Sequence, residues 1–206
     1  MSRINRGFFY DRVRMALFNG RIQPPQAQGM EAILDHWEAT SPGNDDRWLA
    51  YMLATAFHET ARTMQPVRET LAPTDDRAIA ILDRALARGQ LPWVSNPYWR
   101  RDAQGKSWLG RGLVQLTHKT NYAKMSSLVG VDLVADPAQA MRMDVAIRIM
   151  FIGMERGTFT GVRLDQVFNP NREDWVNARK IINRLDRALQ IADYGRAFYG
   201  AISYTT

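Results

Sequence analysis

Hydrophobic positions recur with helical spacing along much of the chain. Met30, Ile33, Leu34 and Trp37 fall at i, i+3, i+4 and i+7, which places them on one face of a helix. Similar spacing predicts an earlier short helix over 9–17, closed by the turn-forming pair Asn19-Gly20. The N-terminal part of the chain is therefore expected to be helical.

The segment WLAYMLATAFHET, residues 48–60, carries two apolar stripes instead of one. The first contains Trp48, Met52 and Ala56, and the second contains Leu49, Leu53 and Phe57. A helix that is apolar on two faces is largely buried. The acidic turn SPGNDD at 41–46 suits its N-terminus, because acidic residues there complement the helix dipole.

Another helix is predicted over about 75–88, with Thr74 as its N-cap, Asp75 and Asp76 in its first turn and Gly89 at its exit. The stretch 90–110 differs, because it is rich in aromatic residues and interrupted by proline and glycine. Its turn at 102–105 lies between two short β-capable runs, so we predict a small β-hairpin there.

The C-terminal half returns to helical spacing. Asp136-Pro137 opens a predicted helix that continues to Ile152. A long apolar stripe over 178–189 predicts a second helix, with further helix to about Ile202. No repeat or linker interrupts the pattern, so we expect one domain over residues 1–206, mainly α with a minor β element.

The composition excludes several kinds of site. The 206 residues include no cysteine, so disulfides and thiolate metal sites are excluded. The three histidines, His36, His58 and His118, have no metal-ligand spacing. The HETAR segment at 58–62 lacks the second histidine of a zinc-binding HExxH motif. We therefore expect neither a metal nor another cofactor.

The formal net charge of +6 favours contact with a polyanion, which can be nucleic acid, an anionic membrane surface or an acidic cell wall. A solvated basic surface is the alternative. The arginines are scattered and form no basic run of the nucleic-acid type, and no apolar segment is long enough to span a membrane. The N-terminus lacks an apolar signal core, so we expect synthesis in the cytoplasm without a classical export signal.

Glu59 has the position of a candidate general acid. It lies seven residues after Met52 and three after Ala56, on an apolar face of the predicted buried helix. Loss of solvation favours the protonated form of a carboxylic acid, which can then protonate a departing oxygen. The alternative is a half-solvated residue in the last helical turn, paired with Arg62.

Two further stretches contain polar residues suited to carbohydrate. The segment GRGLVQLTHKTNY at 110–122 has two glycines around Arg111, followed by amide, hydroxyl and aromatic side chains. It lacks the Gly-Lys-Ser/Thr ending of a phosphate-binding loop. The segment RKIINRLDRA at 179–188 places polar residues within an apolar helix pattern, and these residues can equally form an internal ion pair and a helix cap.

Together, AFHET at 56–60, GRGLVQLTHKTNY at 110–122 and IINRLDRA at 181–188 resemble the three sequence blocks of family 19 glycoside hydrolases. That family comprises chitinases and related bacteriophage endolysins, and the resemblance covers about 30–202. The chain is similar in size to the phage and prophage endolysins. The resemblance implies a lysozyme-like, two-lobed helical fold.

The resemblance also implies roles for individual residues. Glu59 would be the general acid, Glu69 the general base, and Thr117 the hydroxyl that orients the attacking water. The implied substrate-contacting residues are His58, Tyr98, Trp108, Gln115, Asn121, Tyr122, Asn183 and Arg187. Arg187 would be a buried arginine that organises the carboxylates. The sequence departs from the family after Asn183, where Arg184 replaces the usual glycine, and before Gly110, where the usual aromatic is displaced to Trp108.

The expected activity is hydrolysis of β-1,4 bonds in the glycan strands of bacterial peptidoglycan by an inverting mechanism. A chitinase, a lytic transglycosylase and a non-catalytic wall- or nucleic-acid-binding module are the alternatives. The resemblance implies a monomer that binds peptidoglycan and acts in the periplasm, without binding nucleic acid or inserting stably in a membrane. Release would depend on a holin, a partner that permeabilises the inner membrane.

Overall fold

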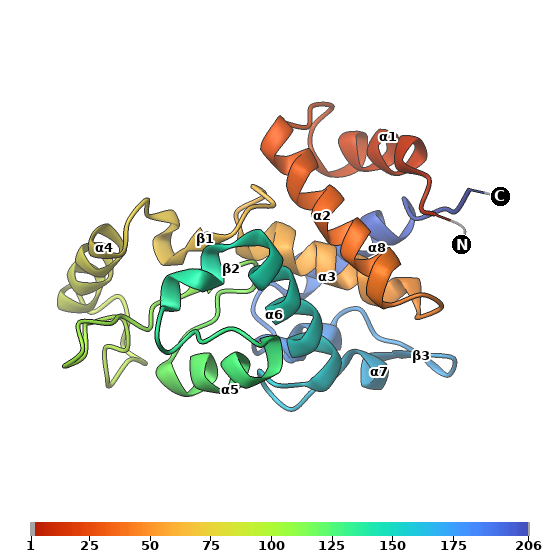
Figure 1. The fold of residues 1–206 in the computed structure, drawn as a ribbon. Coiled ribbons are helices and arrows are strands. Elements are labelled where there is room, and N and C mark those ends of the chain that lie inside the picture. The colour runs from red at the N-terminus through yellow and green to blue at the C-terminus, as the bar shows by residue number, and fades with distance from the viewer. Residues whose placement is uncertain (1–2, 206) are drawn as a thin grey trace. The chain divides into compact units, whose positions relative to one another are not determined.

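The computed structural model describes residues 3–205 as a mainly helical fold with two small two-stranded antiparallel sheets (Figure 1). The contacts between residues divide the chain into two compact units. The first unit contains the described residues of Met1–Gln65 and Met150–Thr206, and the second contains Pro66–Ile149. No helix among residues 3–205 is long and apolar enough to cross a membrane.

The first unit is built around α3, Asp46–Glu59, which packs along α8, Ala188–Tyr199 (Figure 1). Every α3 residue from Leu49 to Phe57 is buried, as the two apolar stripes predict. The unit also contains α1 (Arg6–Leu17), α2 (Pro24–Thr40), α7 (Leu164–Val167), β3 (Phe168–Asn169), β4 (Arg172–Glu173) and the 3-10 helix η3 (Asn177–Ile181). The pairing of Ile4 with Tyr204 brings the two ends of the chain together.

The second unit is held together by a short sheet. Strand β1, Val67–Arg68, pairs antiparallel with β2, Arg111–Gly112. The unit also contains η1 (Glu69–Leu71), α4 (Asp75–Ala87), α5 (Lys119–Val129) and η2 (Pro137–Met141). One core cluster joins α4 to the loop that follows it, through Ala78, Leu82, Trp99 and Leu109. Helix α6, Met143–Arg156, begins in this unit and ends in the first.

Four predicted helices are confirmed, although α1 begins at Arg6, three residues before its predicted start. Asn19 and Gly20 have positive φ at the end of α1, and α2 carries its predicted apolar face inward. Asp45 caps α3 by accepting a hydrogen bond from Arg47 N. Thr74 caps α4 in the same way, from Arg77 N. These helices follow the sequence closely because local capping and tertiary burial favour the same boundaries.

The predicted hairpin at 90–110 is wrong, because no residue of this stretch belongs to a strand. The turn at 102–105 does form, since Asp102 N donates to Lys106 O at 2.8 Å and the Asp102 carboxylate accepts from the amides of Gln104 and Lys106. The flanking runs do not form a ladder with each other. Backbone groups of Gly110 and Arg111 bond to Glu69 and Leu116.

The continuous helix predicted over 178–202 is also wrong. The chain forms η3, then turns through 182–187, and α8 begins only at Ala188. Arg187 has a positive φ of 56°, which no α-helix interior tolerates. As a result Leu185 and Leu189, expected in the apolar stripe, are exposed. The helix predicted from Pro137 is also interrupted. The backbone is extended at Arg142, which separates η2 from α6.

Candidate active site

The carboxyl group of Glu59 is held by a buried arginine. Glu59 is the last residue of α3, and its Oε1 accepts a hydrogen bond from Arg179 Nη1 at 2.6 Å. The side chain of Arg179 is 3% exposed and that of Glu59 16%. Arg179 Nε donates in turn to Asp186 O at 3.1 Å. The guanidinium is therefore held by two hydrogen bonds, one to Glu59 and one to the Asp186 carbonyl. A charge-assisted hydrogen bond from a guanidinium held in this way fixes the orientation of the Glu59 carboxyl group.

The buried arginine that was expected at Arg187 to organise the carboxylates lies at Arg179 instead. Arg187 is exposed, whereas Arg179 lies in η3 and contacts Glu59. The sequence does not distinguish Arg179, because it stands beside a second basic residue, Lys180, between Ala178 and Ile181. Its burial depends on a contact with Glu59, 120 residues away in the sequence.

The backbone after Glu59 is anchored to α2. Thr60 Oγ1 donates to Ala56 O at 2.7 Å and accepts from Met64 N at 3.0 Å. Ala61, Arg62 and Met64 all have positive φ, an unfavourable backbone for residues with side chains. Packing against α2 compensates, because Gln26 Nε2 donates to Arg62 O at 2.9 Å. The turn therefore fixes the last turn of α3.

His58 lies half-buried beside Glu59. Burial lowers the pKa of His58, and the negative charge of Glu59 opposes this effect only in part. The imidazole is therefore neutral near pH 7, with one nitrogen able to donate a hydrogen bond and the other able to accept one. The charges of Asp186 and Arg187 also reach this ring.

In the second unit, Glu69 pairs with Gly110 through two hydrogen bonds. Glu69 N donates to Gly110 O at 2.7 Å, and Gly110 N donates to Glu69 Oε2 at 2.8 Å. The other carboxylate oxygen, Oε1, accepts from the Tyr98 hydroxyl at 2.7 Å. The Tyr98 ring packs on His118, with centroids 4.2 Å apart. The carboxylate thus has a defined orientation, and each oxygen keeps one lone pair.

Gln115 and Thr117 lie beside the same glycine. A Cβ atom on Gly110 would lie 2.7 Å from Gln115 Oε1, 3.3 Å from Thr117 Cγ2 and 3.4 Å from Glu69 Cβ. Gln115 Nε2 donates to Val67 O at 3.0 Å, so its amide spans the β1–β2 sheet. The structure therefore brings Glu69, Gln115 and Thr117 together around Gly110, where a larger residue would displace the Gln115 side chain.

Two of the aromatic residues expected to contact sugar are core residues instead. Tyr122 is fully buried; its hydroxyl donates to Leu109 O at 2.8 Å and accepts from Arg111 Nη1 at 2.9 Å. Burial raises the pKa of Tyr122 to about 12, so this hydroxyl keeps its proton. Trp108 is 5% exposed and donates to Asp102 at 3.1 Å. Trp99, the residue after Tyr98, is also fully buried.

The remaining predicted residues differ in their surroundings. Asn121 is half-buried, and its Nδ2 donates to Thr117 O at 2.9 Å, which ties it to the Gly110 region. Asn183 is exposed, and its Oδ1 accepts from Arg184 N at 2.8 Å. This local hydrogen bond is made by Arg184, the residue that stands where the family has glycine. Asn121 is thus part of a packed site, whereas Asn183 and Arg187 lie on the surface.

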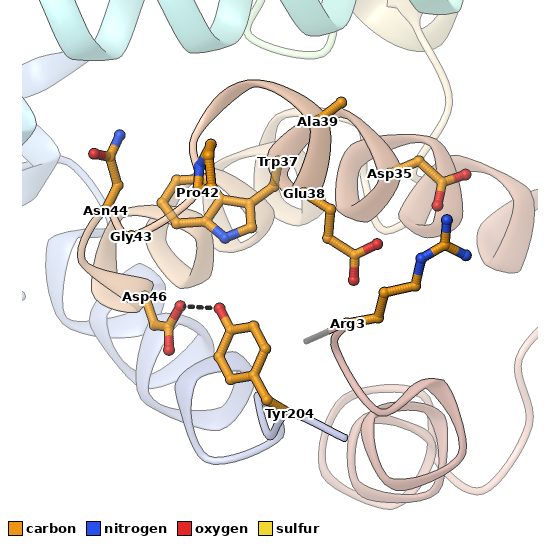
Figure 2. A pocket seen from close by; sticks show the side chains of 10 residues that line it. All are labelled: Arg3, Asp35, Trp37, Glu38, Ala39, Pro42, Gly43, Asn44, Asp46 and Tyr204. Carbon is orange, nitrogen blue, oxygen red and sulfur yellow. Dashed lines mark hydrogen bonds between the residues drawn. The ribbon is translucent and has the colours of Figure 1, made fainter. Parts of the chain in front are cut away.

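A cavity of about 980 Å³ lies at the other end of α3 (Figure 2). Its lining includes Trp37, Glu38, Asp46 and Tyr204, and Figure 2 shows the Tyr204 hydroxyl directed at Asp46. Asp46 and Glu59 are the first and last residues of α3, roughly 20 Å apart along its axis. The cavity is therefore separate from the carboxyl group of Glu59.

Among residues 3–205, no group of three or more His, Asp or Glu side chains is arranged to hold a metal ion. No protein-family model matches the chain, and no curated protein matches its sequence.

Proposed function

We propose that this protein is a glycoside hydrolase that cuts β-1,4 bonds in the glycan strands of bacterial peptidoglycan, as the family 19 endolysins that it resembles do. The observation that carries the proposal is the Glu59–Arg179 pair at the end of a buried helix. A carboxyl group held by a buried guanidinium has one orientation, and general acid catalysis depends on such geometry.

In the proposed reaction, Glu59 carries its proton on Oε2, the oxygen other than the one bonded to Arg179, and gives it to the glycosidic oxygen as the bond to the anomeric carbon breaks. Glu69 takes a proton from a water molecule, whose oxygen attacks the anomeric carbon from the opposite face. Thr117, which lies with Glu69 beside Gly110, orients that water. One water is consumed: its hydroxyl group becomes bonded to the anomeric carbon, its remaining proton goes to Glu69, and the proton from Glu59 completes the hydroxyl group on the leaving sugar.

Charge supports peptidoglycan as the substrate. The formal net charge of +6 draws the protein to an anionic wall, and this attraction weakens as salt rises because the screening length at 0.15 M is only about 8 Å. Uncharged chitin oligomers lack the attraction. We further propose that the protein acts as a monomer in the periplasm after cytoplasmic synthesis, with a holin giving it access to the wall.

The test compares Glu59→Gln with Glu155→Gln on purified peptidoglycan and on chitin oligomers. Glu155 is the matched control, because it is also half-buried in the last turn of a helix, α6. We expect Glu59→Gln to lose about 10²-fold or more in release of soluble glycan, since glutamine donates no proton to the leaving oxygen. Glu155→Gln should retain wild-type activity.

Retention of more than about a tenth of wild-type turnover by folded Glu59→Gln would exclude Glu59 as the acid. Efficient cleavage of chitin without wall lysis would assign the activity to a chitinase instead. Wall binding without release of glycan by the wild-type protein would identify a non-catalytic binding module.

A further inference from the structure

Asp75, the first residue of α4, joins two arginines that flank the Glu69–Gly110 pair. Its Oδ1 accepts a hydrogen bond from Arg68 Nε at 2.7 Å, and its Oδ2 accepts one from Arg111 Nη2 at 2.5 Å. Arg68 directly precedes Glu69, and Arg111 directly follows Gly110. One carboxylate therefore connects the two segments at the residues beside the pair.

The guanidinium of Arg111 organises the loop that contains Gly110. It is 1% exposed, and its Nη1 donates to Ser107 O at 3.0 Å and to Leu109 O at 3.3 Å. The Tyr122 hydroxyl donates to the same Leu109 oxygen at 2.8 Å. The loop backbone is thus wrapped around a buried cation whose only ion-pair partner among the described residues is Asp75.

This network sets the direction of the bond to Glu69. The Leu109 carbonyl and the Gly110 N–H belong to one planar trans peptide unit, so they point in opposite directions. Arg111 and Tyr122 hold the carbonyl on one side. The N–H on the other side is thereby directed at Glu69 Oε2, at 2.8 Å.

The charge state of Asp75 suits this role. Burial alone would raise the pKa of Asp75, but the hydrogen bonds and positive charges of Arg111 and Arg68 hold it below its ordinary value. Asp75 is therefore a carboxylate at neutral pH. Without it, the buried Arg111 would have no counter-ion, and the guanidinium would be free to leave the loop carbonyls.

We propose that Asp75 is a positioning residue for Glu69, acting through Arg111 and the Leu109–Gly110 peptide on one side and through Arg68 on the other. The role of Glu69 as general base rests on the proposed function. The orientation of its carboxylate by Asp75 is a separate claim with its own measurement.

The first measurement is kinetic and compares Asp75→Asn with Asp76→Asn on purified peptidoglycan. Asp76 is the matched control, because it lies next in the same helical turn but is 81% exposed and pairs with Arg101. We expect Asp75→Asn to lower kcat about 10- to 100-fold with little change in KM, since a small misplacement of a catalytic group has that effect. Asp75→Glu, which keeps the charge, should restore part of kcat.

The second measurement needs no activity. The Gly110 amide proton, followed by NMR as a function of pH, reports the ionisation of Glu69 through their hydrogen bond. We expect the amplitude of this titration to fall by half or more in Asp75→Asn and to stay at the wild-type value in Asp76→Asn. If Asp75→Asn does not fold, Arg68→Gln serves instead, because it removes one link and leaves the Asp75–Arg111 pair in place.

Full titration amplitude in folded Asp75→Asn, or in Arg68→Gln where that variant serves, would overturn the proposal, whatever the activity. A reduced amplitude together with a reduced kcat supports it. A reduced amplitude with unchanged kcat supports the positioning of Glu69 by Asp75 and removes Glu69 from the proposed mechanism. The failure of the inference and the failure of the proposed function are therefore distinguishable.

Discussion

The buried guanidinium of Arg179 holds the Glu59 carboxyl group, and the proposed mechanism depends on that orientation. Arg179→Met keeps most of the side-chain volume but removes the charge that pairs with Glu59. Breaking a buried pair by removing one partner typically costs about 3–5 kcal/mol, so we expect a loss of that order in the free energy of unfolding. Urea denaturation measures it, and turnover should fall in parallel.

Arg187→Met is the control for this prediction, since Arg187 is exposed. Exposed substitutions usually change the free energy of unfolding by less than about 0.5 kcal/mol. If Arg187→Met proved as destabilising as Arg179→Met, the assignment of the Glu59 partner to Arg179 would be contradicted.

Glu69 determines the stereochemistry of the proposed reaction. A base that activates water on the far face of the sugar inverts the anomeric configuration. Proton NMR of the first-formed product should therefore show net inversion, and Glu69→Gln should lose most activity. Its control is Glu173→Gln, an exposed glutamate on β4. Net retention, or a fully active Glu69→Gln, would remove Glu69 from the mechanism.

Helix α2 approaches the turn after α3 so closely that Gly29 has no room for a side chain. A Cβ atom there would lie 1.8 Å from Met64 O, a backbone atom that cannot yield without moving the turn. We expect Gly29→Ala to lower the free energy of unfolding by about 1–3 kcal/mol, as over-packing does. It should also lower turnover, because that turn fixes the end of the Glu59 helix.

Gly7→Ala tests the same substitution where there is room. Its Cβ would meet only Asn5 Oδ1, at 3.5 Å, which is an ordinary contact. Alanine favours a helix more than glycine does, so the melting temperature of Gly7→Ala should equal or exceed that of the wild type. Equal destabilisation of both variants would show that the close approach to Met64 is not the cause.

Among the elements, α1 to α4 could be predicted from the sequence, because caps and apolar spacing are local properties. The β1–β2 pairing could not, since its partners are more than 40 residues apart and each strand has two residues. The break at 182–187 was hidden by an apolar stripe that continues through it. Arg179, which makes a tertiary contact with Glu59, bonds to Asp186 O within this break.

The candidate site divides in the same way. Glu59, Gln115 and Thr117 were predicted from the sequence blocks and Glu69 from the endolysin resemblance, and the structure holds each in a defined setting. Tyr122 and Trp108 were expected to contact sugar but are buried in the core. The sequence does not separate these roles, because an aromatic side chain in a polar block can pack in the core or contact a ligand. Arg179 and Asp75 were missed as site residues, since an ion pair between distant segments leaves no spacing in the sequence.

Acid should destabilise the whole molecule. Asp45, Asp75 and Asp174 have pKa values held below the ordinary 3.8, and Glu38 below 4.5. In each case burial opposes the shift and an arginine produces it; for Asp174 the hydrogen bond from Arg172 is the largest effect. The unfolded chain then binds more protons as pH falls through this range, so the stability that these carboxylates contribute is complete above about pH 4.5 and lost below it.

The measurement is the urea midpoint between pH 7 and pH 2.5. We expect a decline that is steepest below about pH 4 and is shallower in Asp75→Asn, which has one such carboxylate fewer. A pH dependence in Asp75→Asn identical to that of the wild type would contradict the assignment for Asp75.

The masses of products formed in ¹⁸O-labelled water test whether the protein hydrolyses the glycan strands of peptidoglycan. Hydrolysis adds one water across each broken bond, and attack at the anomeric carbon places its oxygen on the new reducing end. We expect soluble muropeptides with one labelled oxygen at that end, absent from a Glu59→Gln digest. Unlabelled anhydro products, one water lighter, would instead identify a lytic transglycosylase and overturn the proposed hydrolysis.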